Sequence, residues 1–494
     1  MWLVLLGVLL ALLVIKISQI SQFWRDRGIP YEPYWRYLYR MIWEINRRPI
    51  GDVQRELVKR YGPMYGSYHG SRPTLVVTDV EIVKEVFVKK FESFFSRSFE
   101  FTTGEPLWDN SILQLPKDEW KAVRTIMGYT FTTSKLRGMI LKLDVICKRL
   151  LSKLDTIIDQ EGTLSKYFNS YAVDSIAAIA LGMDVNSIDN PDSEFVKCCT
   201  GIFKPGVASL LALVAPQLLR YVPFVHFPPK KTVDFFTKLS KHVIGEKKKN
   251  LDEALKNGTA DILDLHLLAQ REDPQTILTD EILASQAFIF IVGLDNTVLT
   301  LELATYFLTV FPEAQARAIR EIRSVIGDKS DVDYEDLQKL KFVDACLREA
   351  LRITPMGGVI DRVCNSDTVV AGQEIHKGML IEFNFPHMHN DPKYFPEPEK
   401  YKPERFLRNE GDGPLSELDA FMMFGHGPKN CVGKRLALMN MQILLSNLLL
   451  RFKLEKTDRT PKLPLKLKPG FRGNDITVEP LMLKLVPRVK VNDA

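Results

Sequence analysis

The chain has 494 residues, of which 46% are hydrophobic and 26% are charged. This composition supports a large buried core and excludes an intrinsically disordered protein. The net charge of +5 comes from 66 basic and 61 acidic residues spread along the chain, which argues against nucleic acid as a partner. The six cysteines lack disulfide-framework or metal-binding spacing and indicate reduced thiols.

The first seventeen residues, MWLVLLGVLLALLVIKI, are almost wholly apolar and just long enough to cross a bilayer as a helix. They lack a basic leading region and a small-residue cleavage site, so a retained anchor is favoured over a cleaved signal peptide. Arg25, Arg27, Arg36 and Arg40 follow, and this asymmetry predicts that the C-terminal side lies in the cytosol.

A helix-breaking sequence, Gly28-Ile29-Pro30, follows the apolar segment and indicates a linker into the body of the protein. No internal repeat is visible in the rest of the chain. We therefore expect three parts: an anchor at residues 1–20, a linker at 21–33 and a single domain at 34–494.

Periodicity, capping residues and turn signals predict the elements of the domain. The first half reads as a helix at 50–61, strands at 64–69 and 74–78, a helix at 79–88, a long loop at 94–116, and helices from 119 to about 192 with breaks near 132 and 162. The last part reads as a β- and Pro-rich region at 355–406, a helix at 434–452 and strands at 452–456 and 476–486. We expect a mainly α-helical fold with small β-sheets.

The segment Phe203–Pro229 is rich in Leu, Val, Phe and Pro, and Lys230 and Lys231 follow it. Such an apolar stretch beside cations is either core or a contact with a membrane surface. The membrane contact is favoured because the N-terminal anchor already holds the body at the bilayer.

A helix of more than thirty residues is predicted to run unbroken from its N-cap, Thr279, to about Phe311, where Pro312 ends it. Its middle is apolar on every side, which is typical of a helix through the centre of a domain. The sequence Gly293-Leu294-Asp295-Asn296-Thr297 places polar groups inside this apolar stretch, so we treat it as a candidate functional site.

The sequence FGHGPKNCVG at residues 424–433 leads into the 434–452 helix and places Cys431 at a helix N-terminus. Unpaired N–H groups and the helix dipole stabilise a thiolate there. Glycines allow the backbone to approach a flat group, and Phe424 offers a ring for packing. A thiolate held in this way suits haem iron; the alternative is a structural cysteine before a core helix.

The whole loop motif, Phe-x-x-Gly-x-Lys-x-Cys-x-Gly, resembles the haem-thiolate signature of the cytochromes P-450. Three further motifs stand in that family's order: Trp120-x-x-x-Arg124, Glu349-x-x-Arg352 and Pro403-Glu404-Arg405-Phe406. The resemblance covers the whole chain and looks closest to the microsomal, xenobiotic-metabolising clan of vertebrates and arthropods. It implies the cytochrome P-450 fold, in which the long central helix and the cysteine loop sandwich a haem.

The resemblance also implies roles for individual residues. The cofactor is expected to be haem b with a cysteine thiolate as the axial iron ligand. The residues expected to bind it are Cys431, Trp120, Arg124, Arg362, Lys429, Phe424 and Gly433. Lys429 departs from the family's usual Arg and lacks its bidentate fork, so weaker haem retention is expected. Glu349 and Arg352 share a helix face, and the family implies that Arg405 completes a structural triad with them.

The central helix departs further from the family pattern, which is Ala/Gly-Gly-x-Asp/Glu-Thr-Thr. Asp295 and Thr297 are present, but Asn296 replaces the first Thr and Val292 replaces the small residue. The resemblance implies that Asp295, Asn296 and Thr297 serve proton delivery. An Asn amide donates a hydrogen bond but does not pass a proton as a hydroxyl does, so less efficient oxygen insertion is expected.

The favoured hypothesis is a monooxygenase of the endoplasmic reticulum membrane that inserts one oxygen atom from O₂ into an apolar small molecule. No nicotinamide or flavin fingerprint occurs in the chain, so an NADPH-cytochrome P-450 reductase is expected as electron donor, with a small haem electron-transfer cytochrome as a further candidate partner. Lys121, Lys429 and Lys434 are candidates for the face of this chain on which the electron donor docks. The alternatives are an isomerase or dehydratase of lipid peroxides, favoured by Asn296, and a haem-bound carrier or sensor.

Overall fold

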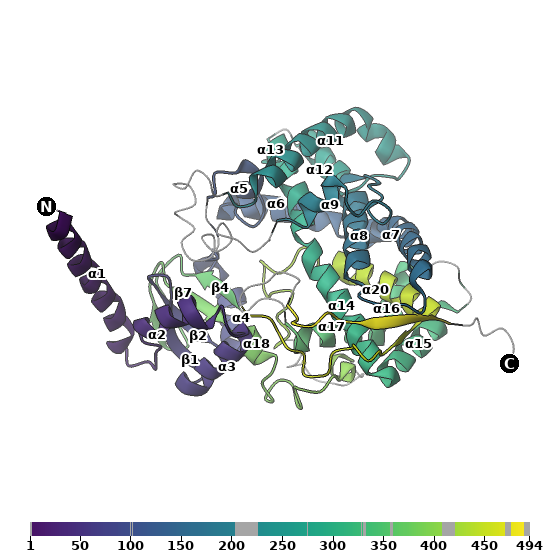
Figure 1. The fold of residues 1–494 in the computed structure, drawn as a ribbon. Helices are drawn as coiled ribbons and strands as arrows, with labels where there is room; N and C mark the ends of the chain where they lie inside the picture. Colours follow the sequence, from purple (N-terminus) through teal and green to yellow (C-terminus); the bar gives the residue numbers. More distant parts are fainter. Residues whose placement is uncertain are drawn as a thin grey trace.

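The computed structural model describes residues 2–98, 100, 102–202, 226–273, 275–327, 329, 332–355, 359–407, 420–469 and 476–488. Helices make up most of this part of the chain, and small sheets lie at two sides of the helical body (Figure 1). The expected mainly helical fold with small sheets is therefore confirmed.

The N-terminal part contains α1 (Trp2–Arg25), α2 (Tyr34–Tyr39), η1 (Arg40–Glu44), α3 (Ile50–Tyr61), β1 (Met64–His69), β2 (Arg72–Val77), α4 (Val80–Lys84), η2 (Glu85–Lys89) and η3 (Phe91–Ser93). The central part contains α5 (Pro106–Asp109), α6 (Lys117–Thr130), α7 (Thr133–Leu154), η4 (Asp155–Ile157), β3 (Glu161–Gly162), α8 (Ser165–Ile176), η5 (Ala177–Leu181), α9 (Glu194–Cys199), α11 (Lys230–Lys256), α12 (Ile262–Glu272), α13 (Asp280–Val292) and α14 (Leu294–Val310).

The C-terminal part contains α15 (Pro312–Ile326), α16 (Tyr334–Lys339), α17 (Lys341–Ile353), β4 (Ile360–Val363), β5 (Thr368–Val370), β6 (Gln373–Ile375), β7 (Leu380–Phe383), α18 (Phe385–Met388), η7 (Pro403–Phe406), α20 (Lys434–Arg451), β8 (Phe452–Glu455) and β9 (Leu483–Pro487). The helix expected at 50–61 and the strand expected at 64–69 occur at the predicted residues, as α3 and β1. The expected strand at 476–486 is shorter than predicted, and the expected 94–116 loop contains α5.

The largest sheet has the strand order β1-β2-β7-β4. Strands β2 and β7 are parallel, whereas β1 and β4 pair antiparallel with their neighbours. A second sheet, β3-β9-β8, lies near the C-terminus, and β5 and β6 form a two-stranded ribbon. The sheets and the helical body together place β4 and the chain that follows β7 beside the cysteine loop.

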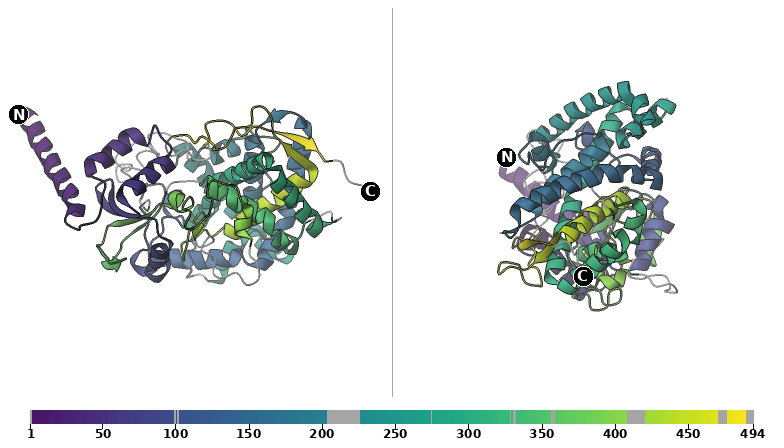
Figure 2. Two further views of the ribbon diagram at one scale, coloured as in Figure 1. Left: turned by 90° about the horizontal axis from the view of Figure 1, so that it is seen from below. Right: turned by 90° about the vertical axis from the view of Figure 1, so that its right-hand side faces the viewer.

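Helix α14 occupies the middle of the helical body, where α8, α17 and α20 pack against it (Figure 1). Apolar side chains on every side of α14 and α20 are buried, which explains why neither sequence shows an amphipathic pattern. Helix α1 projects away from the body in Figure 1 and in the left view of Figure 2. It extends to Arg25, beyond the expected anchor boundary at residue 20.

The prediction of one unbroken central helix is wrong. The helix begins at its expected N-cap, where Thr279 Oγ1 accepts a hydrogen bond from the N–H of Ile282 at 3.2 Å. It stops at Val292 and resumes at Leu294. At Gly293 the N–H bonds Phe290 O, three residues back, because glycine disfavours the regular helical turn. The expected polar residues 295–297 therefore lie in the first turn of a new helix.

Among the residues whose side chains the structure describes, which leave out residues 1–13, one helical stretch, Asp280–Val310, is long and apolar enough to cross a membrane, and 61% of its most apolar window is buried in the protein. This burial identifies it as a core helix. The expected N-terminal anchor forms a helix, but its insertion into a membrane stays a prediction. The expected membrane contact at 203–229 falls largely on residues 203–225, outside the described residues.

Candidate active site

The loop before α20 is a tight turn closed by three backbone hydrogen bonds. The N–H of Cys431 donates to Phe424 O at 2.7 Å, and those of Gly425 and Asn430 donate to Met422 O and Gly427 O. Gly427 has φ +70°, and a Cβ added there would lie 2.1 Å from the carbonyl oxygen of Phe87. No other residue type fits at this position, because both its backbone conformation and the neighbouring chain exclude a side chain.

The thiol of Cys431 is exposed, whereas the other five cysteines are buried. The protein atoms packed around the sulfur raise the pKa of Cys431, while the N–H of Gly433 and the charges of Arg124, Lys434 and Arg97 lower it. A metal ion bound to the sulfur would favour the thiolate further, since a thiol that coordinates a metal is deprotonated.

Four cationic side chains gather near this thiol: Arg97, Arg124, Arg362 and Lys429. Arg362, on β4, is buried and stacks on Phe87 with 4.2 Å between its guanidinium carbon and the ring centre. Its Nε is buried without a hydrogen-bond partner among the described residues. Burial and the charge of Arg97 lower the pKa of Arg362 to about 9, which identifies a buried cation that lacks sufficient anionic compensation.

Arg97 was not singled out from the sequence, although it is the one basic residue in the 94–116 stretch. The loop that carries it is tied to β4 and the chain after it. The N–H of Val363 donates to Ser96 O at 2.8 Å, and Asn365 Oδ1 accepts from the N–H of Phe95 at 2.9 Å. Arg97 in turn donates to Lys429 O at 2.8 Å, so it joins the loop, β4 and the cysteine turn.

Lys429 does not form part of a docking face, since it is only 5% exposed. Its Nζ lies 2.6 Å from a carboxylate oxygen of Glu100 and 3.5 Å from the centre of the Phe95 ring. Burial lowers the pKa of Lys429 to about 8, although Glu100 opposes this shift. Trp120 is buried in the same aromatic group, 5.4 Å from Phe95 between ring centres, and Arg124 donates to Asn430 Oδ1 at 2.6 Å.

Lys121 and Lys434, the other two residues expected in the docking face, have different surroundings from those of Lys429. Lys121 is exposed and pairs with Glu92 at 3.3 Å, so it is available on the surface. Lys434 lies 5.5 Å from the centre of the Phe424 ring. Phe424 is partly buried against the two main apolar clusters, and Gly433 is the N-cap of α20.

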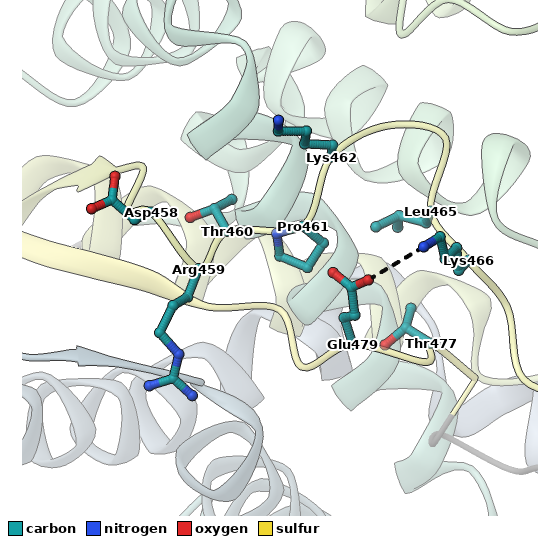
Figure 3. Close-up of a pocket in the computed structure, with 9 residues that line it drawn as sticks. All are labelled: Asp458, Arg459, Thr460, Pro461, Lys462, Leu465, Lys466, Thr477 and Glu479. Carbon is teal, nitrogen blue, oxygen red and sulfur yellow. Dashed lines mark ion pairs between the residues drawn. The ribbon is translucent and has the colours of Figure 1, made fainter.

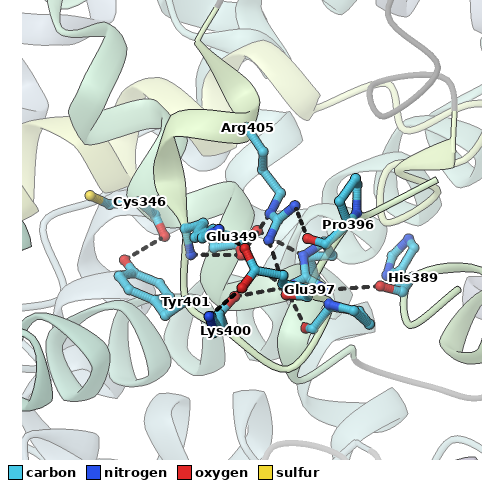
Figure 4. A network of polar contacts seen from close by, with 11 residues as sticks. Cys346, Glu349, His389, Pro396, Glu397, Lys400, Tyr401 and Arg405 are labelled. Carbon is cyan, nitrogen blue, oxygen red and sulfur yellow. Dashed lines mark hydrogen bonds and ion pairs between the residues drawn. The ribbon is translucent and has the colours of Figure 1, made fainter. Parts of the chain in front are cut away.

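The structure brings Glu349, Arg352 and Arg405 together, and Figure 4 shows Arg405 beside Glu349. The Glu349 carboxylate accepts from Arg352 at 2.7 and 2.8 Å and from Arg405 Nε at 3.0 Å. Both arginines also donate to backbone carbonyls between residues 396 and 400. The Glu349 and Arg352 side chains are fully buried, so this network holds the irregular chain after α18 against α17.

A line of hydrogen bonds runs from this triad to the cysteine turn. Arg352 donates to His389 O at 2.8 Å, and His389 Nε2 accepts from the N–H of Met422 at 3.0 Å. Met422 O then accepts from the N–H of Gly425 at 2.8 Å. Burial and the charge of Arg352 lower the pKa of His389 to about 3, so the ring stays neutral and accepts this bond.

The polar residues of the central helix lie in the first turn of α14. Asn296 is exposed, and Asp295 and Thr297 are partly buried. The hydroxyl of Thr300 donates to Asn296 O at 2.6 Å. Phe131 joins the helix break to the start of α20: its ring centre lies 6.0 Å from that of Phe290, in the last turn of α13, and its carbonyl oxygen accepts from Arg435 at 3.0 Å.

Two cavities elsewhere do not contain the candidate residues. One of about 300 Å³ lies under residues 458–466 and 477–479, where Lys466 and Glu479 face each other at 3.8 Å (Figure 3). The other, of about 510 Å³, lies between η5 and α11. Among the described residues, no group of three or more His, Cys, Asp or Glu side chains forms a metal site.

The residues present fit a haem. An accessible thiol at a helix N-terminus supplies one soft ligand for iron, and the porphyrin supplies the other donors. The neighbouring arginines, one with an unpaired buried nitrogen, match the carboxylates at the edge of that group.

A family model described as Cytochrome P450 matches residues 30–478. Cytochrome P450 3A7 of Homo sapiens is 31% identical over 502 residues, which cover 99% of this chain and 96% of the relative. Cytochrome P450 3A41 of Mus musculus is 30% identical over 510 residues, which cover 98% of this chain and 96% of the relative. With these matches and the motif geometry, the chain belongs to the cytochrome P450 family and is a haem-thiolate monooxygenase, an oxidoreductase that acts on apolar molecules with a redox partner.

Proposed function

We propose that this enzyme inserts one oxygen atom from O₂ into an apolar xenobiotic, steroid or fatty-acid type of substrate, with Cys431 as the axial ligand of its haem iron. The observation that carries the proposal is the position of the accessible Cys431 thiol, at the N-terminus of α20 and beside the arginine cluster. The electron donor is an NADPH-dependent reductase, because the chain has no nicotinamide or flavin fingerprint of its own.

Haem, when bound, supplies the one-electron and dioxygen chemistry that no amino-acid side chain provides. The cysteine turn fixes the position of the thiolate sulfur through the bond from the N–H of Cys431 to Phe424 O. Arg124 and Arg362 hold the carboxylate edge of the cofactor. On the side of α14, Asp295 and Thr297 hold and move protons, and the amide of Asn296 donates a hydrogen bond without passing a proton.

The proposed location is the endoplasmic reticulum membrane, with residues 1–20 as a single-span anchor, 21–33 as a linker and 34–494 as a cytosolic catalytic domain. Helix α1 supports this, and so does the surface that follows it. Trp35, Tyr39, Ile42 and Trp43 are exposed at helical spacing on α2 and η1. Exposed aromatic residues beside arginines are typical of the membrane–water interface.

A turnover assay tests the reaction class. The purified protein is given apolar substrates with NADPH and a reductase, and separately a lipid hydroperoxide without NADPH. Product that requires NADPH and O₂ supports the proposal, whereas rearrangement of the hydroperoxide alone supports the isomerase that Asn296 suggests. Spectral shifts with ligands but no turnover in either assay would indicate a carrier or sensor.

A further inference from the structure

The family resemblance places Lys429 among the haem-binding residues, but the structure gives its side chain another partner. Its side chain is 3% exposed and its Nζ lies 2.6 Å from a Glu100 oxygen. Phe95 covers the ammonium group at 3.5 Å from the ring centre, and Trp120 lies 5.5 Å away. The charge of Lys429 is thus already compensated by one carboxylate and by the face of an aromatic ring.

Two arginines of the cluster, Arg362 and Arg124, are less fully compensated than Lys429. Arg362 retains a buried Nε without a partner among the described residues. Arg124 donates to a neutral amide, that of Asn430. Asp361, the second carboxylate of the cluster, accepts from the N–H of Ser98 at 2.8 Å and so fixes the loop next to Arg97.

The charges of the cluster agree with this difference between Lys429 and the arginines. Among the described residues, its four cations face two carboxylates, those of Glu100 and Asp361, so the cations outnumber the carboxylates. The two propionates of a haem would supply further negative charge to these cations. A buried group of charges is stable only when it is compensated in this way.

We propose that Lys429 is held by Glu100 and does not bind a propionate. Arg97, Arg124 and Arg362 are then the cations that hold the two propionates. The Lys429–Glu100 pair compensates its own two charges, while Arg97 is held against the cysteine turn by its separate hydrogen bond to Lys429 O. This inference rests on the proposed haem site and assigns a role to Glu100, which the sequence motifs do not include.

The proposal predicts opposite effects of the two single substitutions. Lys429→Gln leaves the Glu100 charge uncompensated beside the propionates, so haem dissociates about tenfold faster or more and the haem reduction potential falls. Glu100→Gln leaves the Lys429 charge beside them, so haem dissociates no faster than in the wild type and the potential rises. In the double variant the haem dissociation rate returns to within about twofold of the wild-type rate, and the reduction potential returns to the wild-type value.

Haem transfer to an excess of an apo-globin acceptor measures the dissociation rate, and a spectroelectrochemical titration measures the potential. Arg124→Gln is the matched control, because its partner is neutral and Glu100→Gln cannot rescue it. Lys429→Arg keeps the charge and should dissociate haem at the wild-type rate.

A double variant that loses haem as fast as Lys429→Gln would overturn the inference, since Lys429 would then bind a propionate directly. Faster haem loss in Glu100→Gln would overturn it as well, because that result identifies a merely structural contact. Wild-type protein that binds no haem would instead contradict the proposed function, so the two failures are distinguishable.

Discussion

The cysteine turn and the break in the central helix are held in different ways. In the turn, three backbone hydrogen bonds and the close contact of Gly427 with Phe87 fix the backbone conformation. At the break, Gly293 is exposed, a Cβ there would meet only Phe290 O at 3.4 Å, and Asn296 is exposed beside it. The backbone of the first region therefore tolerates little change, and its departure from the family pattern is confined to the side chain of Lys429, whereas the second region departs at both Val292 and Asn296.

The largest effect is expected at the support of the cysteine turn. Glu349→Gln leaves the buried Arg352 guanidinium without a full counter-charge, and breaking such a pair costs about 3–5 kcal/mol of unfolding free energy. Haem-loaded, folded protein should be largely lost, as measured by holoprotein yield and thermal unfolding. Glu404→Gln in the same segment is the control, since its pair with Arg317 is exposed and worth about 0–1 kcal/mol. Equal losses in both variants would contradict the account.

A smaller effect is expected from pH, through His389. Its folded-state pKa of about 3 lies below its ordinary value of about 6.5. Between these values the unfolded chain binds a proton that the folded chain does not bind. The unfolding free energy therefore decreases as pH falls below about 6.5, by up to about 1.4 kcal/mol per pH unit from this residue.

His389→Gln keeps a hydrogen-bond acceptor for the N–H of Met422 but removes the titrating ring. Urea unfolding at pH 7.5, 6.5 and 5.5 should show a shallower decline for this variant than for the wild type. Parallel curves would show that His389 is not the source of acid sensitivity.

The smallest effect is expected at the helix break. Asn296→Thr restores a hydroxyl beside Asp295, so the product formed per NADPH consumed should rise about twofold to tenfold, below the roughly hundredfold that a positioned proton-transfer group contributes alone. Asn296→Ala, which removes the hydrogen-bond donor, should lower the same ratio. If neither variant changes it, Asn296 does not limit proton delivery.

The contrast between the cysteine turn and the helix break also explains which structural features can be predicted from the sequence. The cysteine turn, the N-cap at Thr279 and the bounds of α3 follow from local rules, because glycine, capping and periodicity act within a few residues. The break at Gly293 was missed since one glycine in a strongly apolar stretch is compatible with a continuous helix. Lys429 and Glu100 are 329 residues apart in the chain, and no local pattern indicates a contact of that separation.

The central claim is that Cys431 is the thiolate ligand of the haem, and the absorption spectrum of the reduced, CO-bound protein tests it most directly. The wild type should show the long-wavelength Soret band that thiolate ligation gives, and Cys364→Ala, which changes a buried cysteine, should keep it. Cys431→Ala should lose the band. A Cys431→Ala protein that retains the band would contradict the assignment of the ligand and the account of the turn that carries it.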